Sequence, residues 1–488
     1  MISFAPFEPD KGPFSATSCD TAMNILPNAM GWGPMPQLSD LSAALTDQCY
    51  GAWWYRNTTG SFGLIAATKT KIYRMTSTGT WTDISKGGGT YTGPDTGDLW
   101  QAERFGTKIY LTNLNDPLQV LDVDTGSAFA DASGSPPRAK YIETVGDFLF
   151  LAYLKVGADV FPQDWQHCKI NDPTNWTVTG AAGDSDRQQI ADGDEIVAIM
   201  SNIGGARIIQ RRCKRRLIFT PGSTYSFQMQ DIDGARGAVA PLCVVPFGGE
   251  AYLYLNETGL YVGDEHRPIG AERIDDWFFK QVNLDKLGEV QGVADPSQKI
   301  VWILFTDQNS QKKMFGWQWV LDLFVPPTDA APTILVSTVS IGAVLNDLDA
   351  LGTLDQINIP LDSRQFKGGR ITFGAFTAAN KLALFAGSPA AATAETATTE
   401  LTPESGSFVS GAKLKSDAPS TYTMQVGSAQ VADASLTWSS ANTRAARTGL
   451  VPFRSDAKLH RFRVNIPAGA DWSHLHGVSP EFQPSGAA

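Results

Sequence analysis

Residues 99–131 read LWQAERFGTKIYLTNLNDPLQVLDVDTGSAFAD, a stretch with two short apolar strands and two turns. The turns are expected at 115–117 (Asn-Asp-Pro) and 124–126 (Asp-Thr-Gly), because these residue types favour tight turns. The phrase GTKIYL at 106–111 places a glycine turn just before a run of β-branched and aromatic residues, which indicates the start of a strand. This strand-turn-strand unit is the pattern that predicts the fold.

Similar phrases occur six times, at 60–65, 106–111, 146–151, 205–209, 249–254 and 297–302. Their spacing is roughly 40–60 residues, close to the ~40–50 residues of one four-stranded propeller blade. We therefore predict an all-β protein in which residues 50–329 form a β-propeller-like domain of about six units.

The two flanks have different textures. Residues 1–49 carry six prolines and few periodic segments, which predicts an extended N-terminal arm. Residues 330–488 contain alternating stretches at 370–376, 421–426 and 460–466, which predict half-buried strands of a C-terminal β-sandwich or barrel-like domain. Within this part, residues 386–410 are rich in Ala, Thr and Ser and are expected to form a long low-complexity loop.

Composition limits the possible functions. The chain is 42% hydrophobic and 18% charged, which excludes wholesale disorder, and 46 Gly with 28 Pro suit a turn-dense β protein. A net charge of −11 argues against nucleic-acid binding by phosphate neutralisation. An acidic chain can still line a channel through which DNA slides without sticking, since like charges weaken the association.

The five cysteines are odd in number, widely spread and free of any C-x-x-C spacing (Cys19, Cys49, Cys168, Cys213 and Cys243). This pattern argues against a disulfide framework or a zinc site and favours assembly in a reducing cytoplasm. The opening MISFAPFEPDKG lacks the basic start and apolar run of a secretory signal, so we expect no export. The apolar run at 331–345 falls short of the ~20 residues that a membrane span needs, and we read it as buried strands.

The strongest charge feature is a basic run within GARIIQRRCKRRLIF, which comprises Arg207, Arg211, Arg212, Lys214, Arg215 and Arg216. Such a run can face a negatively charged neighbouring subunit or phosphates. The alternative is a solvated strand edge, where charges discourage edge-to-edge aggregation.

No catalytic, metal-binding or cofactor-binding residues are predicted. The acid pairs Asp122/Asp124 and Asp275/Asp276 are expected to cap turns. As sequence neighbours on a strand, Asp275 and Asp276 would point to opposite faces and cannot by themselves flank one glycosidic bond. Residues 122–126 begin like a calcium loop but lack the later acidic ligand. His474 and His476 would need a third ligand to hold zinc, and hydrogen-bonded strand histidines are favoured. The sequence has no G-x-S-x-G, H-E-x-x-H or P-loop motif.

Tryptophans occur about once per unit, which fits large rings in the cores between blades better than a carbohydrate-binding platform. The set is Trp53, Trp54, Trp81, Trp100, Trp165, Trp176, Trp277, Trp302, Trp317 and Trp319.

Four phrases occur together in one order: NILP at 24–27, INDPTNW at 170–176, GARG at 234–237 and IGAERIDDWFF at 269–279. With a looser match at 472–474, this set resembles structural proteins of tailed bacteriophages, especially the tail nozzle or packaged-DNA stabilisation proteins of short-tailed phages. The resemblance covers roughly residues 20–325.

The resemblance implies a virion subunit rather than an enzyme. It implies a β-propeller-containing protein that forms a homohexameric ring below the portal and adaptor, closes the channel after packaging and guides double-stranded DNA outward at ejection. Needle, fibre or tip proteins would surround it. The implied location is the virion tail, after assembly in the host cytoplasm.

Within this hypothesis, the proline-rich arm would embrace a neighbour and the basic run 207–216 would contact another subunit. The low-complexity loop would form a gate or tip, with Ala386, Thr393, Glu395, Glu400 and Ser410 as candidates. The alternative function is a carbohydrate-binding or carbohydrate-cleaving propeller of a tail receptor-binding component. A bacterial surface adhesin is a third alternative, disfavoured by the missing signal sequence.

Overall fold

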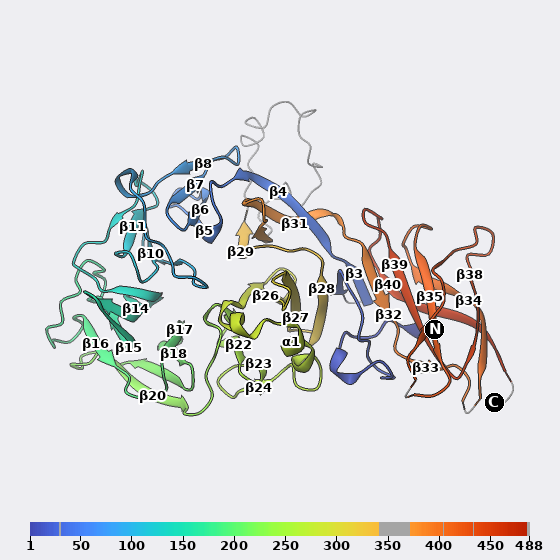
Figure 1. Cartoon of the computed structure of the whole chain (residues 1–488). Coiled ribbons are helices and arrows are strands. Elements are labelled where there is room, and N and C mark those ends of the chain that lie inside the picture. Colours follow the sequence, from blue (N-terminus) through green and yellow to red (C-terminus); the bar gives the residue numbers. More distant parts are fainter. Residues whose placement is uncertain (29–30, 341–370, 404, 433, 486–488) are drawn as a thin grey trace.

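The structure is a computed structural model that describes residues 1–28, 31–340, 371–403, 405–432 and 434–485 (Figure 1). Within these residues the chain forms seven four-stranded antiparallel sheets and two six-stranded sheets. The seven sheets follow one another around a ring, and the two larger sheets form a sandwich beside it (Figure 1). The predicted fold class, an all-β propeller-like domain with a C-terminal sandwich, is confirmed.

Six blades are continuous in sequence, and each begins with its innermost strand. Blades one to three are β5 (Cys49–Arg56), β6 (Phe62–Thr68), β7 (Ile72–Met75), β8 (Trp81–Asp83); β9 (Gln101–Phe105), β10 (Lys108–Thr112), β11 (Gln119–Asp122), β12 (Ala130–Asp131); and β13 (Arg138–Val145), β14 (Phe148–Val156), β15 (Asp159–His167), β16 (Asp186–Gln189). Blades four to six are β17 (Ile196–Asn202), β18 (Gly205–Gln210), β19 (Lys214–Phe219), β20 (Phe227–Asp233); β21 (Val244–Gly248), β22 (Ala251–Asn256), β23 (Gly259–Val262), β24 (Arg267–Pro268); and β25 (Gln291–Asp295), β26 (Ile300–Thr306), β27 (Lys312–Gln318), β28 (Leu323–Thr328).

The six repeated phrases coincide with β6, β10, β14, β18, β22 and β26, the second strand of each of these blades. Within residues 99–131, the two predicted turns separate β10 from β11 and β11 from β12. Asp122 holds the second turn, because its Oδ1 accepts hydrogen bonds from the amides of Asp124 (3.0 Å) and Thr125 (3.1 Å). The predicted turn-capping role of this acid pair is confirmed for Asp122.

The predicted count of about six units falls one short, since the structure has a seventh blade. It consists of β29 (Ile334–Ser340), β30 (Ile371–Phe376) and β31 (Lys381–Pro389), with β4 (Pro36–Ala44) as its outermost strand. Residues assigned to the arm and to the C-terminal domain therefore belong to the propeller, and the predicted boundaries at 49 and 329 differ from the observed ones. The ring closes through β4, because main-chain pairing joins an early strand to a late blade.

The sandwich has two sheets. One is ordered β2 (Ile25–Asn28), β3 (Gly31–Pro34), β40 (Leu475–Pro484), β34 (Ser407–Ser416), β38 (Val451–Ala457), with β1 (Ile2–Ser3) also on β40; the other is ordered β32 (Ala392–Glu395), β39 (Leu459–Ile466), β35 (Thr423–Ala429), β36 (Thr437–Trp438), with β33 (Thr399–Glu400) on β39 and β37 (Asn442–Thr443) on β35. The N-terminal residues thus pair within the sheets of their own chain, and the prediction that residues 1–49 form an extended arm rather than packed elements is wrong.

The prediction of a long loop at 386–410 is also wrong. This segment contains the end of β31, all of β32 and β33, and the start of β34. Its alanines and threonines have small side chains that fit the tightly packed sandwich, and Ala392, Ala394 and Ala397 belong to the hydrophobic core.

Helices are short. The α-helix α1 (Asp275–Gln281) is accompanied by 3₁₀ turns η1 (Pro9–Lys11), η2 (Lys86–Gly88), η3 (Pro241–Cys243) and η4 (Leu284–Glu289).

The cores between blades contain large aromatic side chains, as predicted from the tryptophan spacing. Trp100, Trp165, Trp302 and Trp317 are fully buried. Trp53, Trp54, Trp81, Trp277 and Trp319 are only partly buried. One hydrophobic cluster runs from blades five and six through the N-terminal residues into the sandwich, and it includes Phe7, Leu253, Phe315, Val409 and Phe462. The two parts of the molecule therefore share a core.

Candidate functional site: a charged anchor beneath the N-terminal strap

A buried ionic cluster joins the two halves of the chain, and we call it the anchor: Asp20, Glu395, Arg461 and Arg463. Glu395 of β32 lies directly opposite Arg463 of β39, and Arg461 is two residues earlier on the same face of β39. The Nε atom of Arg461 lies 2.9 Å from Glu395 Oε2, and Arg463 pairs with the other carboxylate oxygen. The side chains of Glu395 and Arg461 are 0% and 1% exposed, so both charges are withdrawn from water.

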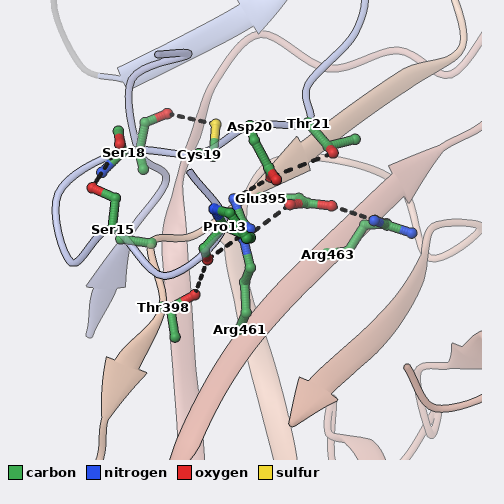
Figure 2. Close-up of polar contacts among 12 residues, drawn as sticks. Pro13, Ser15, Ser18, Cys19, Asp20, Thr21, Glu395, Thr398, Arg461 and Arg463 are labelled. Atoms are coloured by element: carbon green, nitrogen blue, oxygen red, sulfur yellow. Dashed lines mark hydrogen bonds and ion pairs between the residues drawn. The ribbon is translucent and has the colours of Figure 1, made fainter. Parts of the chain in front are cut away.

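The first part of the chain, residues 1–24, folds over this cluster, and we call it the strap (Figure 2). Arg461 Nη1 donates a hydrogen bond to the Pro13 carbonyl (3.2 Å), and Arg461 Nη2 lies 2.8 Å from Asp20 Oδ1. The Thr398 hydroxyl donates to the same Pro13 carbonyl (2.7 Å). A buried arginine thus holds strap backbone and strap carboxylate together, as Figure 2 shows.

Burial dominates the electrostatics of the anchor. It raises the pKa of the Glu395 carboxyl, while the guanidinium groups of Arg461 and Arg463 act in the opposite direction. It also raises the pKa of the neighbouring Cys19 thiol to about 12. Since the thiolate is the nucleophile, Cys19 is chemically inert at neutral pH. The arrangement is suited to fastening the strap rather than to bond making.

The strap also grips the propeller at α1. Arg273 Nε lies 2.6 Å from Glu8 Oε1. The Asp10 carboxylate accepts hydrogen bonds from the backbone amides of Asp276 (2.9 Å) and Trp277 (2.8 Å), which otherwise lack partners at a helix start. The ring of Phe7 packs edge-on against Trp277, with centroids 5.6 Å apart. The strap therefore contacts both the sandwich and blade five's connection to blade six.

Asp275 is buried at the start of α1, where its Oδ1 accepts the Leu260 amide (3.2 Å). Gly259 and Gly270 leave the space it occupies, because a Cβ at either position would lie 2.2 or 1.9 Å from a carboxylate oxygen of Asp275. Burial raises the pKa of Asp275 to about 7, and the charges of Asp10 and Asp276 add to that effect. Asp275 and Asp276 start a helix, whereas the sequence predicted a turn.

The basic run does not form one surface. Arg207, Lys214 and Arg215 are buried, and the other three are partly or fully exposed. Arg207 pairs with Glu250 and Asp264 of blade five, and Arg215 pairs with Asp192 and Asp231. β19 is also an inner member of its sheet, between β18 and β20, so neither an exposed strand edge nor a continuous contact patch describes the run.

The remaining members of the run are paired within the chain as well. Arg211 Nη2 lies 3.3 Å from Glu195, Arg212 Nε lies 2.9 Å from Asp194, and Arg216 shares Asp264 with Arg207. Lys214 Nζ donates to the Tyr254 hydroxyl (3.0 Å) and to the carbonyls of Gly263 (3.2 Å) and Asp264 (3.0 Å). Burial lowers the pKa of Lys214 to about 8. The basic run therefore forms ion pairs and hydrogen bonds within blade four and between blades four and five.

The five gate candidates lie on four strands: Ala386 on β31, Thr393 and Glu395 on β32, Glu400 on β33 and Ser410 on β34. The structure therefore does not bring them together as one loop. Glu395 belongs to the anchor, and the Thr393 hydroxyl donates to Asn465 Oδ1 (3.0 Å). Glu400 and Ser410 are exposed.

Two carboxyl groups that the sequence reasoning missed lie on neighbouring inner strands, Glu103 on β9 and Glu143 on β13. Burial, followed by repulsion from Glu143, raises the pKa of Glu103 to about 7. Burial also raises the pKa of Glu143, whose Oε1 accepts the Ser201 amide (2.8 Å). Each glutamate stands three residues before a repeat glycine, Gly106 or Gly146, and that matching position was the available signal.

The anchor was missed as a unit because its members come from distant parts of the sequence. Of its four members, only Glu395 is among the residues that the sequence predicts as functional, and there it is a candidate of the gate or tip loop. Alternation at 460–466 placed Arg461 and Arg463 on one face of a strand, but a single sequence does not show that Glu395 and Asp20 meet that face.

The described part of the chain contains no group of three or more His, Cys, Asp or Glu side chains that could hold a metal ion. His474 Nδ1 instead lies 3.3 Å from Asp417, and its ring packs 4.7 Å from that of His476. No helix among the described residues is long and apolar enough to cross a membrane.

No family model and no curated protein matches this sequence. Solved structures with a similar chain include the mitotic checkpoint complex (10% identity, TM-score 0.38, 74% of this chain and 96% of that one). Another is the computationally designed Ika8 protein, with 11% identity and a TM-score of 0.38 over 79% of this chain and 100% of that one. A third is BamB from Moraxella catarrhalis, with 10% identity and a TM-score of 0.37 over 74% of this chain and 95% of that one. The propeller fold follows from the sheet topology of this chain itself.

Proposed function

We propose that this protein is a structural subunit of a bacteriophage virion, a tail nozzle protein that forms a ring around the DNA exit channel below the portal and adaptor. The resemblance at 24–27, 170–176, 234–237 and 269–279 suggests this role. The observation that carries it is the rigid joining of propeller and sandwich by one shared core and by the strap, because a ring under the pressure of packaged DNA needs subunits that do not bend.

The strap supports this proposal at both of its ends. Asp10 and Glu8 fasten it to α1 and Arg273, and Asp20 fastens it to Arg461. A hinge between the two parts would have to break these contacts together and expose the shared apolar core. Relative motion of propeller and sandwich is thereby suppressed, in contrast to the domain motion expected across small polar interfaces.

Charge supports the conduit part of the proposal. The chain carries a net charge of −11, and a ring of several copies multiplies it. Such a ring repels the DNA backbone and lets it slide. A closed ring uses heterologous contacts, in which two different surfaces of each copy meet.

The test is the oligomeric state of the purified full chain, measured by native mass spectrometry and by electron microscopy of negatively stained particles. The expected result is a closed ring of identical copies with a central opening wide enough for duplex DNA. A chain that stays monomeric at every concentration, alone and with its adaptor-bound portal, contradicts the nozzle role.

The second candidate function, a carbohydrate-binding or carbohydrate-cleaving propeller, is favoured by one observation: Glu103 and Glu143 lie on adjacent inner strands with raised pKa values. Paired carboxyls with different environments are the usual acid and base of glycoside hydrolysis. Incubation with host surface polysaccharide distinguishes the two functions. Cleavage that is lost in both Glu103→Gln and Glu143→Gln favours the second, and absence of cleavage with an intact ring favours the first.

A further inference from the structure

A cavity of about 220 Å³ opens where the inner strands of several blades begin. Its wall includes Tyr50 of β5, Gln291 of β25, Ile334 of β29 and residues 94–99, which lead into β9. All of these lie at the starting end of an inner strand, so the cavity occupies one mouth of the ring's central opening. We call it the mouth cavity. Drug-sized ligands fill about 300–1,000 Å³, so this cavity suits a smaller molecule.

Three lysines line the mouth cavity: Lys69 between β6 and β7, Lys286 on η4 and Lys312 at the start of β27. None of their ammonium groups makes a hydrogen bond or ion pair with a residue that the structure describes. Burial lowers the pKa of Lys312, Glu289 opposes that effect, and Lys286 adds to it. Positive charge is therefore gathered here at an energetic cost.

The carboxylates of the wall do not balance these lysines. Asp98 lies 2.7 Å from Lys140 Nζ, and Asp95 accepts a hydrogen bond from the Asn115 amide (2.9 Å). Lys140 lies outside the cavity and compensates Asp98, whereas the neutral side-chain amide of Asn115 leaves the charge of Asp95 in place. Glu289 also keeps its charge, and it packs so close to Gly97 that a Cβ there would lie 3.2 Å from Glu289 Cγ. Three lysines thus face two carboxylates without a cationic partner, which leaves an excess of positive charge.

The wall is fixed before any ligand arrives. The Asp116 carboxylate accepts the amides of Thr92 (3.0 Å) and Gly93 (2.8 Å) and so holds the segment that leads to residues 94–99. Gly93 has φ +77° and approaches Lys69 closely enough that a Cβ would lie 2.1 Å from the Lys69 carbonyl oxygen. A ligand that enters this cavity has little ordering cost to overcome.

We propose that the mouth cavity binds a small anion, either inorganic phosphate or a small molecule that bears a phosphate or carboxylate group, through Lys286 and Lys312. An ammonium group acts as a compact point charge toward such groups. Its attraction is stronger in a partly enclosed cavity than in bulk water. The volume is far too small for a DNA duplex, and the site is independent of the nozzle role.

Isothermal titration calorimetry on the purified full chain tests this proposal, with inorganic phosphate in one series and succinate in another, at fixed ionic strength. Saturable binding of at least one anion is expected, and the phosphate and succinate series show which anionic group the site prefers. The K286Q/K312Q variant is expected to bind at least tenfold more weakly. The Glu289→Gln variant is expected to bind severalfold more tightly, because it removes one of the two opposing charges.

The matched control is the double variant K155Q/K415Q. Lys155 lies on β14 and Lys415 on β34, both outside the mouth cavity, and the two substitutions change the net charge by the same two units as K286Q/K312Q, so binding is expected to be unchanged. The proposal is overturned if neither anion binds saturably, or if K286Q/K312Q has the wild-type melting temperature and the wild-type affinity. If the double variant does not fold, Glu289→Gln decides: affinity equal to or below that of wild type overturns the proposal.

Discussion

Arg211 and Arg215 stand four residues apart in the basic run, yet the chain surrounds them differently. The side chain of Arg215 is 8% exposed between Asp192 and Asp231, whereas that of Arg211 is 46% exposed beside Glu195. A buried charge whose partners become repulsive costs much more than an exposed one. The contribution of each arginine in this run to stability therefore depends on how deeply its side chain is buried.

We predict that Arg215→Glu lowers the free energy of unfolding by about 3 kcal/mol or more, since breaking a buried ion pair costs about 3–5 kcal/mol. Arg211→Glu, its matched control, is expected to change it by less than about 1 kcal/mol. Urea denaturation followed by tryptophan fluorescence measures both. Equal losses of unfolding free energy in the two variants would contradict the prediction that the buried arginine contributes more to stability than the exposed one. If Arg211 contacts a neighbouring copy, ring assembly in Arg211→Glu is lost while the fold is kept.

A second residue-scale prediction concerns pH and Asp275. Burial raises its pKa in the folded chain to about 7 from the ordinary 3.8, so the folded state keeps a proton that the unfolded chain releases. Stability from this group is therefore present at about pH 4, falls as the pH rises toward about 7, and is absent above that. Asp275→Asn stays neutral and keeps an acceptor for the Leu260 amide.

The Asp275→Asn variant is expected to exceed wild type by about 2–4 kcal/mol in free energy of unfolding at pH 8, and to match it near pH 4. Urea titrations at several pH values between these limits measure the difference. Asp159→Asn, an exposed carboxylate on β15, serves as control and should track wild type across the range. A pH-independent difference for Asp275→Asn would contradict the assigned proton.

At the scale of elements, the anchor joins β32 and β39 to the strap. We predict that Glu395→Gln lowers the free energy of unfolding by about 3–5 kcal/mol, because it leaves the buried Arg461 without its fully buried opposite charge. The matched pair is Lys413 and Glu481 on β34 and β40, whose side chains are 45% and 49% exposed. Lys413→Gln should cost less than about 1 kcal/mol in the same urea assay. A similar small loss in Glu395→Gln would mean that Asp20 alone holds Arg461.

The repeat shows at element scale what the sequence could predict. In each of the first six blades, a turn followed by an apolar run marks the second strand in the sequence, because that strand is buried on both faces. The seventh copy is also present in the sequence as GGRITF at 368–373, but it follows the sixth after a longer interval, and its alternation alone predicts a strand of the sandwich. The role of β4 had no local signal, since an outermost strand is polar and is recruited by a partner more than 300 residues away.

At the scale of the whole molecule, the shared core makes a prediction about cooperativity. Wild type is expected to unfold in a single calorimetric transition, although it contains a propeller and a sandwich, because Phe7 and its neighbours bury apolar surface from both. A variant without residues 1–24 should keep β4 and the closed ring but show two separate transitions. Differential scanning calorimetry distinguishes these outcomes, and two transitions in wild type would contradict the shared core.

Composition and alternation could predict the overall architecture, but they could not predict which charged side chains are buried. Arg207 and Glu395 both belong to segments that looked solvated, a basic run and a low-complexity stretch, yet both are buried in ion pairs. Whether a charged residue faces water depends on partners such as Asp264 and Arg461, which strand pairing over long sequence distances supplies. The strap was hardest to predict, since its prolines indicate extension and leave its binding partner unspecified.

The pairing of β3 with β40, at Trp32 and Leu475, has a consequence for biosynthesis. A ribosome that adds about 5–20 residues per second needs roughly 20–90 s between these two positions. During this time β3 of the nascent chain pairs only with β2, so its other edge stays open, and β4 likewise waits for β31. Unpaired strand edges invite association with other chains. Holding chaperones that cover these open edges during translation are therefore expected to raise the yield in a recombinant host.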